Sequence, residues 1–349
     1  MKQILLDLEK SDLENLIKEL GEPKFRASQI FDAVFLGLQI DEISNIPKTL
    51  KAKLNKNYIA NPVSVYKKFV SKDGTIKYAL KLQDEEIIEC VVLSYKYGRT
   101  ICLSTQIGCR MGCAFCASGL NGLVRNLTAG EILGEILTVN RDLQGGGTKR
   151  EITNIVLMGS GEPLDNYENV TKFLKIVSSE DCLNISQRNI SLSTCGLVEK
   201  IKKLADDGFS LTLTISLHAP NNEIRKQIMK VANAYDIQEV IDAAKYYFKK
   251  TGRRVVFEYS MISGVNDSFE CAKQLAKLVS GFPSHINLIP LNSVKEKNLN
   301  ATSKKQIYAF KEKLESFGAS VSIRRSLGAD IEGACGQLRN KLLKNGSQN

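Results

Sequence analysis

The stretch Cys109-Arg110-Met111-Gly112-Cys113-Ala114-Phe115-Cys116 contains three cysteines, separated by three residues and then by two. It directly follows an apolar, β-rich run over residues 101–106. Three thiolates this close together can bind three corners of one small inorganic cluster, one ligand fewer than closed metal sites use. A 4Fe-4S cube held in this way keeps one iron open, where chemistry can take place. The nearest histidine, His218, lies about a hundred residues away, so the stretch offers zinc no local fourth ligand.

Two other interpretations of the three cysteines stay open at this point. Cysteine without a disulfide is among the most buried residue types, so all three could belong to the core. They could also bind zinc together with a fourth ligand from a distant part of the chain. The protein would then be a non-catalytic, zinc-stabilised RNA-binding protein. The spacing, with an aromatic residue just before Cys116, favours an iron–sulfur cluster.

Length and charge bound the class of protein. The 349 residues, 43% of them hydrophobic, suffice for one large domain and a smaller one. The formal charge of +10 favours an anionic partner such as nucleic acid, although a solvated lysine-rich surface gives the same charge. Composition alone therefore leaves the partner undecided.

The cysteine count and the N-terminus indicate the compartment. Nine cysteines are an odd number, and they are scattered through a chain too long to need disulfide staples. Acidic residues occur within the first seven positions, which is not the pattern of a secretory signal. No apolar run approaches the roughly twenty residues that cross a bilayer. We therefore expect a soluble, cytoplasmic protein with reduced thiols and no membrane contact.

Residues 1–94 are predicted to form an accessory domain. The capping-box sequence Ser11-Asp12-Leu13-Glu14 predicts the start of a first helix, and further helices are expected over 26–35 and 48–56. Lysines at positions 48, 51, 53 and 56 give the third helix a face that is either basic for RNA or simply solvated. Asp73-Gly74 then predicts the turn of a β-hairpin.

Residues 95–330 are predicted to form a core in which strands alternate with helices. Strands are expected over residues 100–106, 153–158, 189–194, 211–217, 254–261, 285–291 and 319–323. Helices are expected over residues 128–143, 167–178, 197–207, 236–250, 267–280 and 302–316. Repeated strand-then-helix units require parallel strands with helical crossovers, so we expect an α/β barrel or an incomplete one. Its site should lie at the C-terminal ends of the strands.

The predicted strand ends are rich in glycine and polar residues, as a site there requires. Gly159-Ser160-Gly161 is not a dinucleotide-binding fingerprint, because the third glycine is replaced by Leu164 and Pro163 stands where the helix should open. Glycines followed by Glu162 suit a small zwitterion such as an amino acid. A lone histidine is more often an interior residue than a catalyst, but His218 stands at the end of another predicted strand, which makes it a stronger candidate for the site.

With these motifs in place, the sequence resembles the RlmN/Cfr family of radical S-adenosylmethionine (SAM) RNA methyltransferases over nearly its whole length. The segments that carry the resemblance are Cys102–Cys109, the cysteine motif, Met158–Pro163, Ser216–His218 and Gly328–Leu338. The last contains Ala-Cys-Gly-Gln-Leu after the final predicted strand. The resemblance implies a partial (βα)6 radical SAM barrel with a small helical N-terminal domain and a β-hairpin connection. Residues 331–349 would be a C-terminal segment carrying a methyl-carrier cysteine.

The resemblance also implies roles for individual residues. Cys109, Cys113 and Cys116 would ligate one 4Fe-4S cluster, whose open iron binds SAM. The SAM contacts would be Gly161, Glu162, Ser193, Ser216, Leu217, His218 and Asn292. Cys335 would accept a methyl group from a first SAM, and a radical made from a second SAM would activate that methyl for addition to adenine. Cys102 would release the product by forming a disulfide with Cys335, and Glu89 would accept the substrate proton.

This division of roles agrees with the chemistry of the substrate. Adenine C2 is electron-poor and has no lone pair that could attack the methyl group of SAM, whereas a thiolate has one. Release then needs a base and a second thiol. Without the resemblance, Glu89 would be assigned to the polar face of a strand and Cys102 to the core. Cys335 could equally be a surface thiol.

The same resemblance implies the partners. The substrates would be 23S rRNA and, in some bacteria, tRNA, with the adenine flipped into the site. An electron donor such as flavodoxin or ferredoxin would be required, and the protein would act as a monomer. The Cfr branch shares the cysteines but methylates C8 and confers antibiotic resistance. The segment Gly161-Glu162-Pro163 and the pair Arg324-Arg325 favour the C2-methylating branch.

Overall fold

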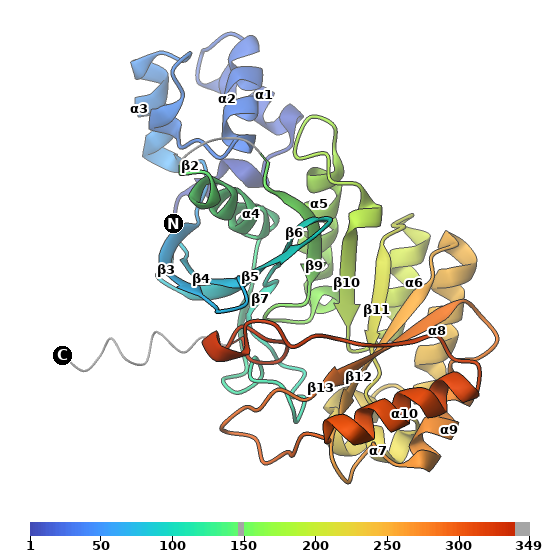
Figure 1. The fold of residues 1–349 in the computed structure, drawn as a ribbon. Helices are drawn as coiled ribbons and strands as arrows, with labels where there is room; N and C mark the ends of the chain where they lie inside the picture. The colour runs from blue at the N-terminus through green and yellow to red at the C-terminus, as the bar shows by residue number, and fades with distance from the viewer. Residues whose placement is uncertain (146–149, 339–349) are drawn as a thin grey trace.

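The computed structural model of the protein describes residues 1–145 and 150–338. A ten-stranded sheet forms its centre, with helices on the outer face and a small helical unit at one end (Figure 1). The residues 339–349 of the predicted C-terminal segment lie outside the described residues.

Seven neighbouring strands of the sheet run parallel and form the incomplete barrel. In spatial order they are β6 (Gly98–Cys102), β9 (Ile152–Leu157), β10 (Ile190–Thr194), β11 (Thr212–Ser216), β12 (Val255–Met261), β13 (Ser284–Pro290) and β14 (Val321–Ile323). The helices that connect them are α4 (Ala129–Leu143), α5 (Tyr167–Ser178), α6 (Val198–Asp206), α8 (Ile237–Thr251), α9 (Phe269–Leu278) and α10 (Lys304–Ser316). Six strand–helix units and a short last strand confirm the predicted partial (βα)6 barrel.

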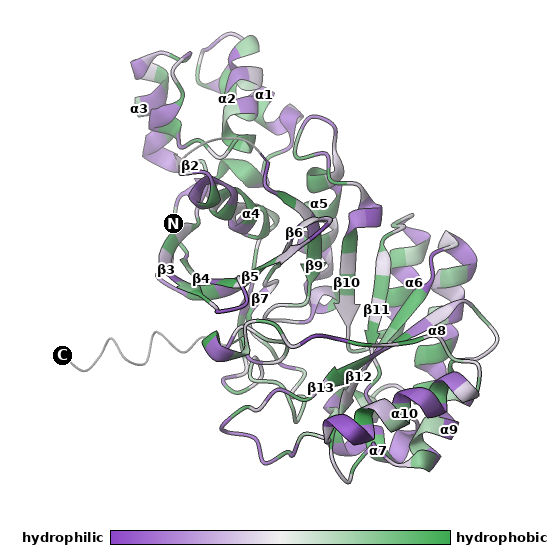
Figure 2. Cartoon of the chain, viewed as in Figure 1, coloured by the Kyte–Doolittle hydropathy of each residue, from purple (hydrophilic) through white to green (hydrophobic). Residues whose placement is uncertain are grey.

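Burial of apolar strand residues holds these layers together. Ile155, Leu192, Ile215 and Phe257 are fully buried in one continuous hydrophobic core. Each such side chain contributes about 1.5–3 kcal/mol by leaving water. Figure 2 shows the hydrophobic colouring of β12 and the hydrophilic colouring along much of α10.

The predicted core elements lie within two residues of their observed bounds, with one exception. The strand predicted over 100–106 ends at Cys102, because the backbone N–H groups of Thr105 and Gln106 bond to the carbonyl of Ser160 instead of continuing the sheet. The short helix α7 (Asn222–Ile228) was not predicted. Asn221 caps it by accepting a hydrogen bond from the N–H of Ile224 at 3.0 Å.

The N-terminal helical unit packs against α4. It comprises β1 (Gln3–Ile4), η1 (Leu5–Asp7), α1 (Lys10–Glu19), α2 (Phe25–Phe35), α3 (Lys48–Asn57) and β2 (Tyr58–Ile59). The first helix starts at Lys10, and the N–H of Glu9 bonds to Asp12, so the prediction of Ser11 as its cap was wrong. Asp7 accepts a hydrogen bond from the N–H of Gly130 at 2.7 Å, which attaches the unit to the start of α4.

The predicted hairpin is part of the central sheet rather than a separate connection. Its antiparallel strands are β3 (Ser64–Val70), β4 (Ile76–Lys81) and β5 (Ile87–Tyr95). Strand β5 also pairs with β6 of the barrel, for example Val91 with Cys102. The sheet therefore continues across the predicted domain boundary between residues 94 and 95.

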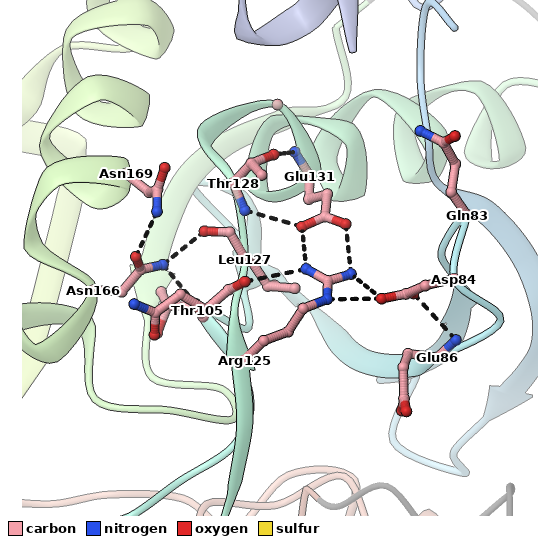
Figure 3. A network of polar contacts seen from close by, with 12 residues as sticks. Gln83, Asp84, Glu86, Thr105, Arg125, Leu127, Thr128, Glu131, Asn166 and Asn169 are labelled. Atoms are coloured by element: carbon pink, nitrogen blue, oxygen red, sulfur yellow. Dashed lines mark hydrogen bonds and ion pairs between the residues drawn. The ribbon is translucent and has the colours of Figure 1, made fainter. Parts of the chain in front are cut away.

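The cysteine loop projects from the barrel between two short antiparallel strands, β7 (Gln106–Gly108) and β8 (Leu123–Asn126). Arg125 on β8 anchors this loop (Figure 3), because its guanidinium bonds to Asp84 at 2.7 Å and to both carboxylate oxygens of Glu131. Asn166 donates hydrogen bonds to the carbonyls of Thr105 and Leu127, one on each side of the loop. The loop is thus fixed at its base.

Within residues 1–145 and 150–338, none of the helices combines the length and apolar character that a bilayer crossing requires.

Candidate active site

Two adjoining cavities lie at the C-terminal ends of the parallel strands. Cavity A contains most of the predicted site residues, namely Cys109, Cys113, Cys116, Gly161, Glu162, Ser193, Ser216, His218, Asn292 and Cys335. Cavity B lies beside it and is lined by Cys102 and Cys335 together with residues of β5 and of the loop after β14. Residues from positions 91 to 338 therefore meet at one edge of the sheet, as the parallel topology predicted.

The three cysteines of the motif all line cavity A, and no cysteine in the described residues is in a disulfide. Burial raises the pKa of Cys109 to about 12 and raises that of Cys113 further, because a buried thiolate without a bound cation is disfavoured. Bound iron reverses this balance, since metal ligation deprotonates a thiol. Among the described residues, no three His, Cys, Asp or Glu side chains converge as ligands of a single ion. The thiols of a cubic cluster bind different irons and need not converge.

The turn after β9 brings glycine and an acid to cavity A. Gly161 has φ of +106°, and a Cβ there would lie 2.7 Å from the side chain of Gln106, so only glycine fits. Glu162 is buried, and its two carboxylate oxygens accept the N–H groups of Cys195 at 2.7 Å and Leu164 at 3.1 Å. Burial raises the pKa of Glu162 while these bonds oppose the rise. The turn after β9 therefore places the Glu162 carboxylate, a hydrogen-bond acceptor, next to the backbone of Gly161, which no side chain covers.

His218 lines cavity A as a neutral side chain. It is buried, has φ of +55°, and accepts a hydrogen bond from the N–H of Ser260 at 2.9 Å through Nδ1. Burial lowers the pKa of His218 to about 3, with the charge of Arg225 adding to the effect. Phe115 of the cysteine loop packs edge-on against the imidazole, with the ring centroids 4.6 Å apart. His218 can therefore bind a ligand by hydrogen bonding and packing, without positive charge.

Ser193 and Ser216 stand on neighbouring strands with their hydroxyl oxygens 3.4 Å apart, and both line cavity A. Leu217 differs from the other predicted SAM contacts, since its side chain is fully buried in the core and does not line either cavity. Its backbone N–H donates to the carbonyl of Glu258 at 3.1 Å. The structure thus brings together the predicted serines but turns Leu217 inward.

Cys335 lines both cavities, and its side chain is the exposed thiol at their junction. Asn292, which also lines both, donates a hydrogen bond to the carbonyl of Cys335 at 3.1 Å. Cys102 lines cavity B from the end of β6. Burial raises the pKa of Cys102 well above its usual value, and the nearby Cys335 raises it further. The two thiols predicted to form a transient disulfide therefore line the same cavity.

Glu89 is buried rather than facing solvent, contrary to what strand alternation alone suggested. Its carboxylate forms an ion pair with Lys77 of β4 at 3.1 Å. Glu89 lies outside the residues lining cavity B, but Val91, two positions further along β5, lines it. Alternate strand residues share a face, so Glu89 is on the cavity side of the sheet.

Arg324 and Glu258 line cavity A and were not predicted as site residues. Their side chains form an ion pair at 3.1 Å, and Arg324 also lines cavity B. Burial raises the pKa of Glu258, and the charge of Arg324 opposes the rise. The Oε2 atom of Glu258 is buried without a hydrogen-bond partner in the described residues. The only sequence signal was that each stands at or near a strand end.

Known protein families match both the N-terminal unit and the core of this chain, and relatives match nearly its whole length. Residues 103–276 match the model of the radical SAM superfamily, and residues 4–59 match that of the ribosomal RNA large subunit methyltransferase N-terminal domain. A protein of Clostridium novyi named probable dual-specificity RNA methyltransferase RlmN is 51% identical over 99% of this chain and 100% of its own length. One of the same name from Clostridium perfringens is 53% identical over 99% of this chain and 98% of its own.

This chain belongs to the RlmN family of radical SAM methyltransferases.

The RlmN-family assignment agrees with a solved structure. The crystal structure of a radical SAM methyltransferase from Sphaerobacter thermophilus matches with a TM-score of 0.93 and 40% identity, covering 97% of this chain and 100% of that one. The protein is therefore an RNA methyltransferase that uses a 4Fe-4S cluster and SAM. The interpretation as a non-catalytic zinc protein was wrong. A cavity lined by three thiols, a carboxylate and two serines fits both the cluster and SAM.

Proposed function

We propose that this RNA methyltransferase modifies C2 of an adenine in 23S rRNA and in tRNA, through a methylated Cys335 and with two SAM molecules per product. The observation that supports this most is the place of Cys335, which lines both cavities. On one side it faces the cavity with the three-cysteine motif, and on the other the cavity with Cys102. A residue that receives a methyl group in one cavity and delivers it in the other must lie where the two meet.

In this proposal the residues that line cavity A have two roles: one group holds the cluster, and the other binds SAM. Cys109, Cys113 and Cys116 hold the cluster, which when bound supplies the electron that cleaves SAM. SAM contacts Gly161, Glu162, Ser193, Ser216, Leu217, His218 and Asn292. Because the Leu217 side chain is in the core, its contact is made through the backbone. Neutral His218, Ser193 and Ser216 orient SAM by hydrogen bonding rather than by charge.

The residues of cavity B complete the transfer. The Cys335 thiolate attacks the methyl group of a first SAM, so a new sulfur–carbon bond forms as the sulfonium carbon–sulfur bond breaks and S-adenosylhomocysteine leaves. A radical made from the second SAM takes a hydrogen atom from the methyl group of Cys335, and the resulting methylene carbon adds to adenine C2. The adduct then gives back one electron, equal to the one that cleaved SAM, and Glu89 accepts the C2 proton. The Cys102 thiolate next bonds to the sulfur of Cys335 and breaks its bond to the methylene carbon, which takes up a proton to become the methyl group of the product. This leaves a disulfide between Cys102 and Cys335, which a thiol reductant must reduce before the next turnover.

We base the proposed target atom, C2, and the two proposed RNA substrates on the names of the relatives. Their name, dual-specificity RNA methyltransferase RlmN, supports two RNA substrates and the C2 branch. Methylation at C8 is the competing outcome within the same chemistry. Nucleoside mass spectrometry of 23S rRNA and tRNA from cells with and without the enzyme separates 2-methyladenosine from 8-methyladenosine by retention time.

Three further parts of the proposal concern the surroundings of the enzyme. Residues 1–94 contact RNA, a small redox protein such as flavodoxin or ferredoxin supplies electrons, and the protein acts as a cytoplasmic monomer. Activity with each purified donor tests the second part. Light scattering of the cluster-loaded enzyme, with and without RNA, tests the third.

Two cysteine substitutions test the mechanism. Cys335→Ala should abolish methyl transfer while the visible absorption of the cluster persists, because this thiol carries carbon and not iron. Cys109→Ala should lose the cluster absorption itself. Mass spectrometry of the peptide with Cys335, isolated from cells, should find one methyl group added. Retained RNA methylation by Cys335→Ala would contradict the methyl-carrier role.

A further inference from the structure

Lys77 and Glu89 form a buried ion pair on the cavity side of the sheet. Each of the two side chains is only 7% exposed, and Nζ lies 3.1 Å from Oε1. Lys77 stands opposite Val91, and Val91 stands opposite Cys102, so the three residues form one row across β4, β5 and β6. Glu89 belongs to the next row, where it is diagonal to Lys77 and within reach of its long side chain. Lys77 is therefore in the same row as Cys102, a thiol of cavity B, and Glu89 is one row away.

Lys77 also reaches the loop that carries Cys335. Its Nζ donates a hydrogen bond to the carbonyl oxygen of Glu332 at 3.3 Å, three residues before Cys335. Gly333 and Ala334, which lie between them, line cavity B. One ammonium group thus touches both the carboxylate of Glu89 and the backbone of the Cys335 loop.

The turn that precedes β4 holds the same loop at further points. Asp330 accepts hydrogen bonds from the hydroxyl of Ser71 at 2.6 Å and from the N–H of Lys72 at 3.3 Å. Asp73 accepts the N–H of Gly328 at 2.8 Å. The loop itself is left-handed at Gly328 and at Glu332, with φ of +67° and +51°. Such a conformation at a glutamate persists only where surrounding contacts hold it.

We propose that Lys77 is a positioning residue that holds the Glu89 carboxylate and the Cys335 loop in one arrangement, so that proton acceptor and methyl carrier act on the same base. This inference rests on the roles proposed above for Glu89 and Cys335. A cation beside a buried carboxylate favours the charged form, which is the form able to accept a proton. Stability alone would not require the pair, since burying two ions costs several kcal/mol per ion before their attraction offsets it.

The test compares Lys77→Met with Lys77→Arg in cluster-loaded enzyme given SAM, an electron donor and rRNA. With Lys77→Met, Cys335 should still become methylated, but free methylated RNA should fall by about a hundredfold, the range a general base contributes. RNA should instead remain covalently joined to Cys335, because the C2 proton is not removed. A nuclease-sensitive band of protein on a denaturing gel reports this adduct. Lys77→Arg should restore most of the product, since it keeps a cation at the position.

A matched control and a second variant make the result decisive. Lys311→Met removes a more exposed lysine–glutamate ion pair of α10, with Glu315, and should leave product formation unchanged. Asp330→Ala, at an exposed position, removes the hydrogen bonds that join the Cys335 loop to Ser71 and Lys72. This variant should speed amide hydrogen exchange in residues 328–335 and lower the amount of methylated RNA. If Lys77→Met does not fold, Asp330→Ala still tests whether the position of the Cys335 loop matters for product formation.

Three outcomes overturn the inference. The first is wild-type product from Lys77→Met, and the second is Lys77→Arg no better than Lys77→Met in a folded, cluster-loaded state. The third is unchanged hydrogen exchange and product in Asp330→Ala, which would mean that contacts with the turn before β4 do not hold the Cys335 loop. Glu89→Gln and Cys335→Ala separate this failure from that of the proposed function. If either of those two variants keeps full activity, the proposed mechanism fails, whatever Lys77 does.

Discussion

Glu135 of α4 shows how a single buried acid affects stability. Its side chain is fully buried, Oε2 accepts the N–H of Ser104 at 3.3 Å, and Oε1 has no hydrogen-bond partner among the described residues. Burial raises its pKa well above the ordinary value. Above pH 4.5 the unfolded chain releases this proton while the folded protein retains it, so the contribution of Glu135 to stability falls as pH rises.

Glu135→Gln should therefore stabilise the protein at neutral and alkaline pH, because the amide keeps the acceptor without an ionisable group. The advantage should grow by up to about 1.4 kcal/mol per pH unit above pH 4.5, until the pH reaches the folded-state pKa. Urea unfolding of both proteins at pH 5 and pH 8, under anaerobic conditions, measures it. An equal difference at the two pH values would contradict the assignment.

At this scale the sequence predicted residues by local spacing and missed those that depend on distant partners. The motif Cys109–Cys116 could be recognised because its ligands are adjacent in sequence. Glu89 looked solvent-facing by alternation, since its partner Lys77 comes from another strand. Arg324 and Glu258 form an ion pair although they are 66 residues apart in the sequence, and no local sequence pattern indicates such a pair.

At the scale of elements, Gly159 decides how closely β9 approaches the end of β6. A Cβ at this position would lie 2.5 Å from the carbonyl oxygen of Leu103, which accepts the N–H of Gly159 at 2.9 Å. Gly159→Ala should cost about 1–3 kcal/mol through overpacking and should also weaken SAM binding, because Gly159 lines both cavities. Thermal unfolding and equilibrium dialysis with SAM provide the two measurements.

Gly208→Ala is the matched control. Gly208 has φ of +80° with open space around its Cα, so alanine there adds backbone strain without a clash. It should lower stability and leave SAM affinity unchanged. If both variants lost SAM affinity equally, the close approach of β9 to β6 would not be what shapes the cavity.

The loop with the three cysteines depends on Arg125 in the same way. Arg125→Met would leave Glu131, which is almost fully buried, without its cation, and should cost about 2–3 kcal/mol. The loosened base of the loop should speed loss of the cluster to an iron chelator, followed by visible absorbance. Arg99→Met removes a more exposed pair with Glu151 and should cost under about 1 kcal/mol, with unchanged cluster loss. Equal chelation rates for the two variants would argue against the anchoring role.

Elements with a clear period were predictable, and irregular ones were not. The pattern over 167–178 predicted α5 at its observed bounds, since an amphipathic helix of that length is set by its own residues. The chain leaves the sheet after Cys102. The N–H of Ser160 donates a hydrogen bond to the hydroxyl of Ser104, which lies 56 residues earlier in the sequence, and this bond helps to hold the bend. That bend creates the cavity edge, so the site depends on contacts that sequence periodicity does not contain.

At the scale of the whole molecule, the helical unit lies away from the C-terminal ends of the parallel strands, where residues line the two cavities. In Figure 1, α3 is beyond α4, and the arrowhead of β10 points away from both. Two lysines of the predicted basic face on α3 are engaged inside the unit. Lys51 donates to the carbonyl of Asp41, and Lys53 donates to that of Leu20. Lys48 and Lys56 remain exposed on a helix that is largely hydrophilic (Figure 2).

This separation gives a length-dependent prediction for RNA binding. Replacing both Lys48 and Lys56 with glutamine should weaken binding of a long rRNA fragment and reduce the slope of log affinity against log salt by about 1 for each phosphate that the protein no longer neutralises. Binding of a short hairpin with only the target loop should not change, because such an RNA cannot extend from the cavities to α3. Replacing Lys304 and Lys305 of α10 with glutamine removes the same charge elsewhere and controls for net charge. If the short and the long RNA were weakened equally, α3 would act through the general field of the protein rather than as a contact surface.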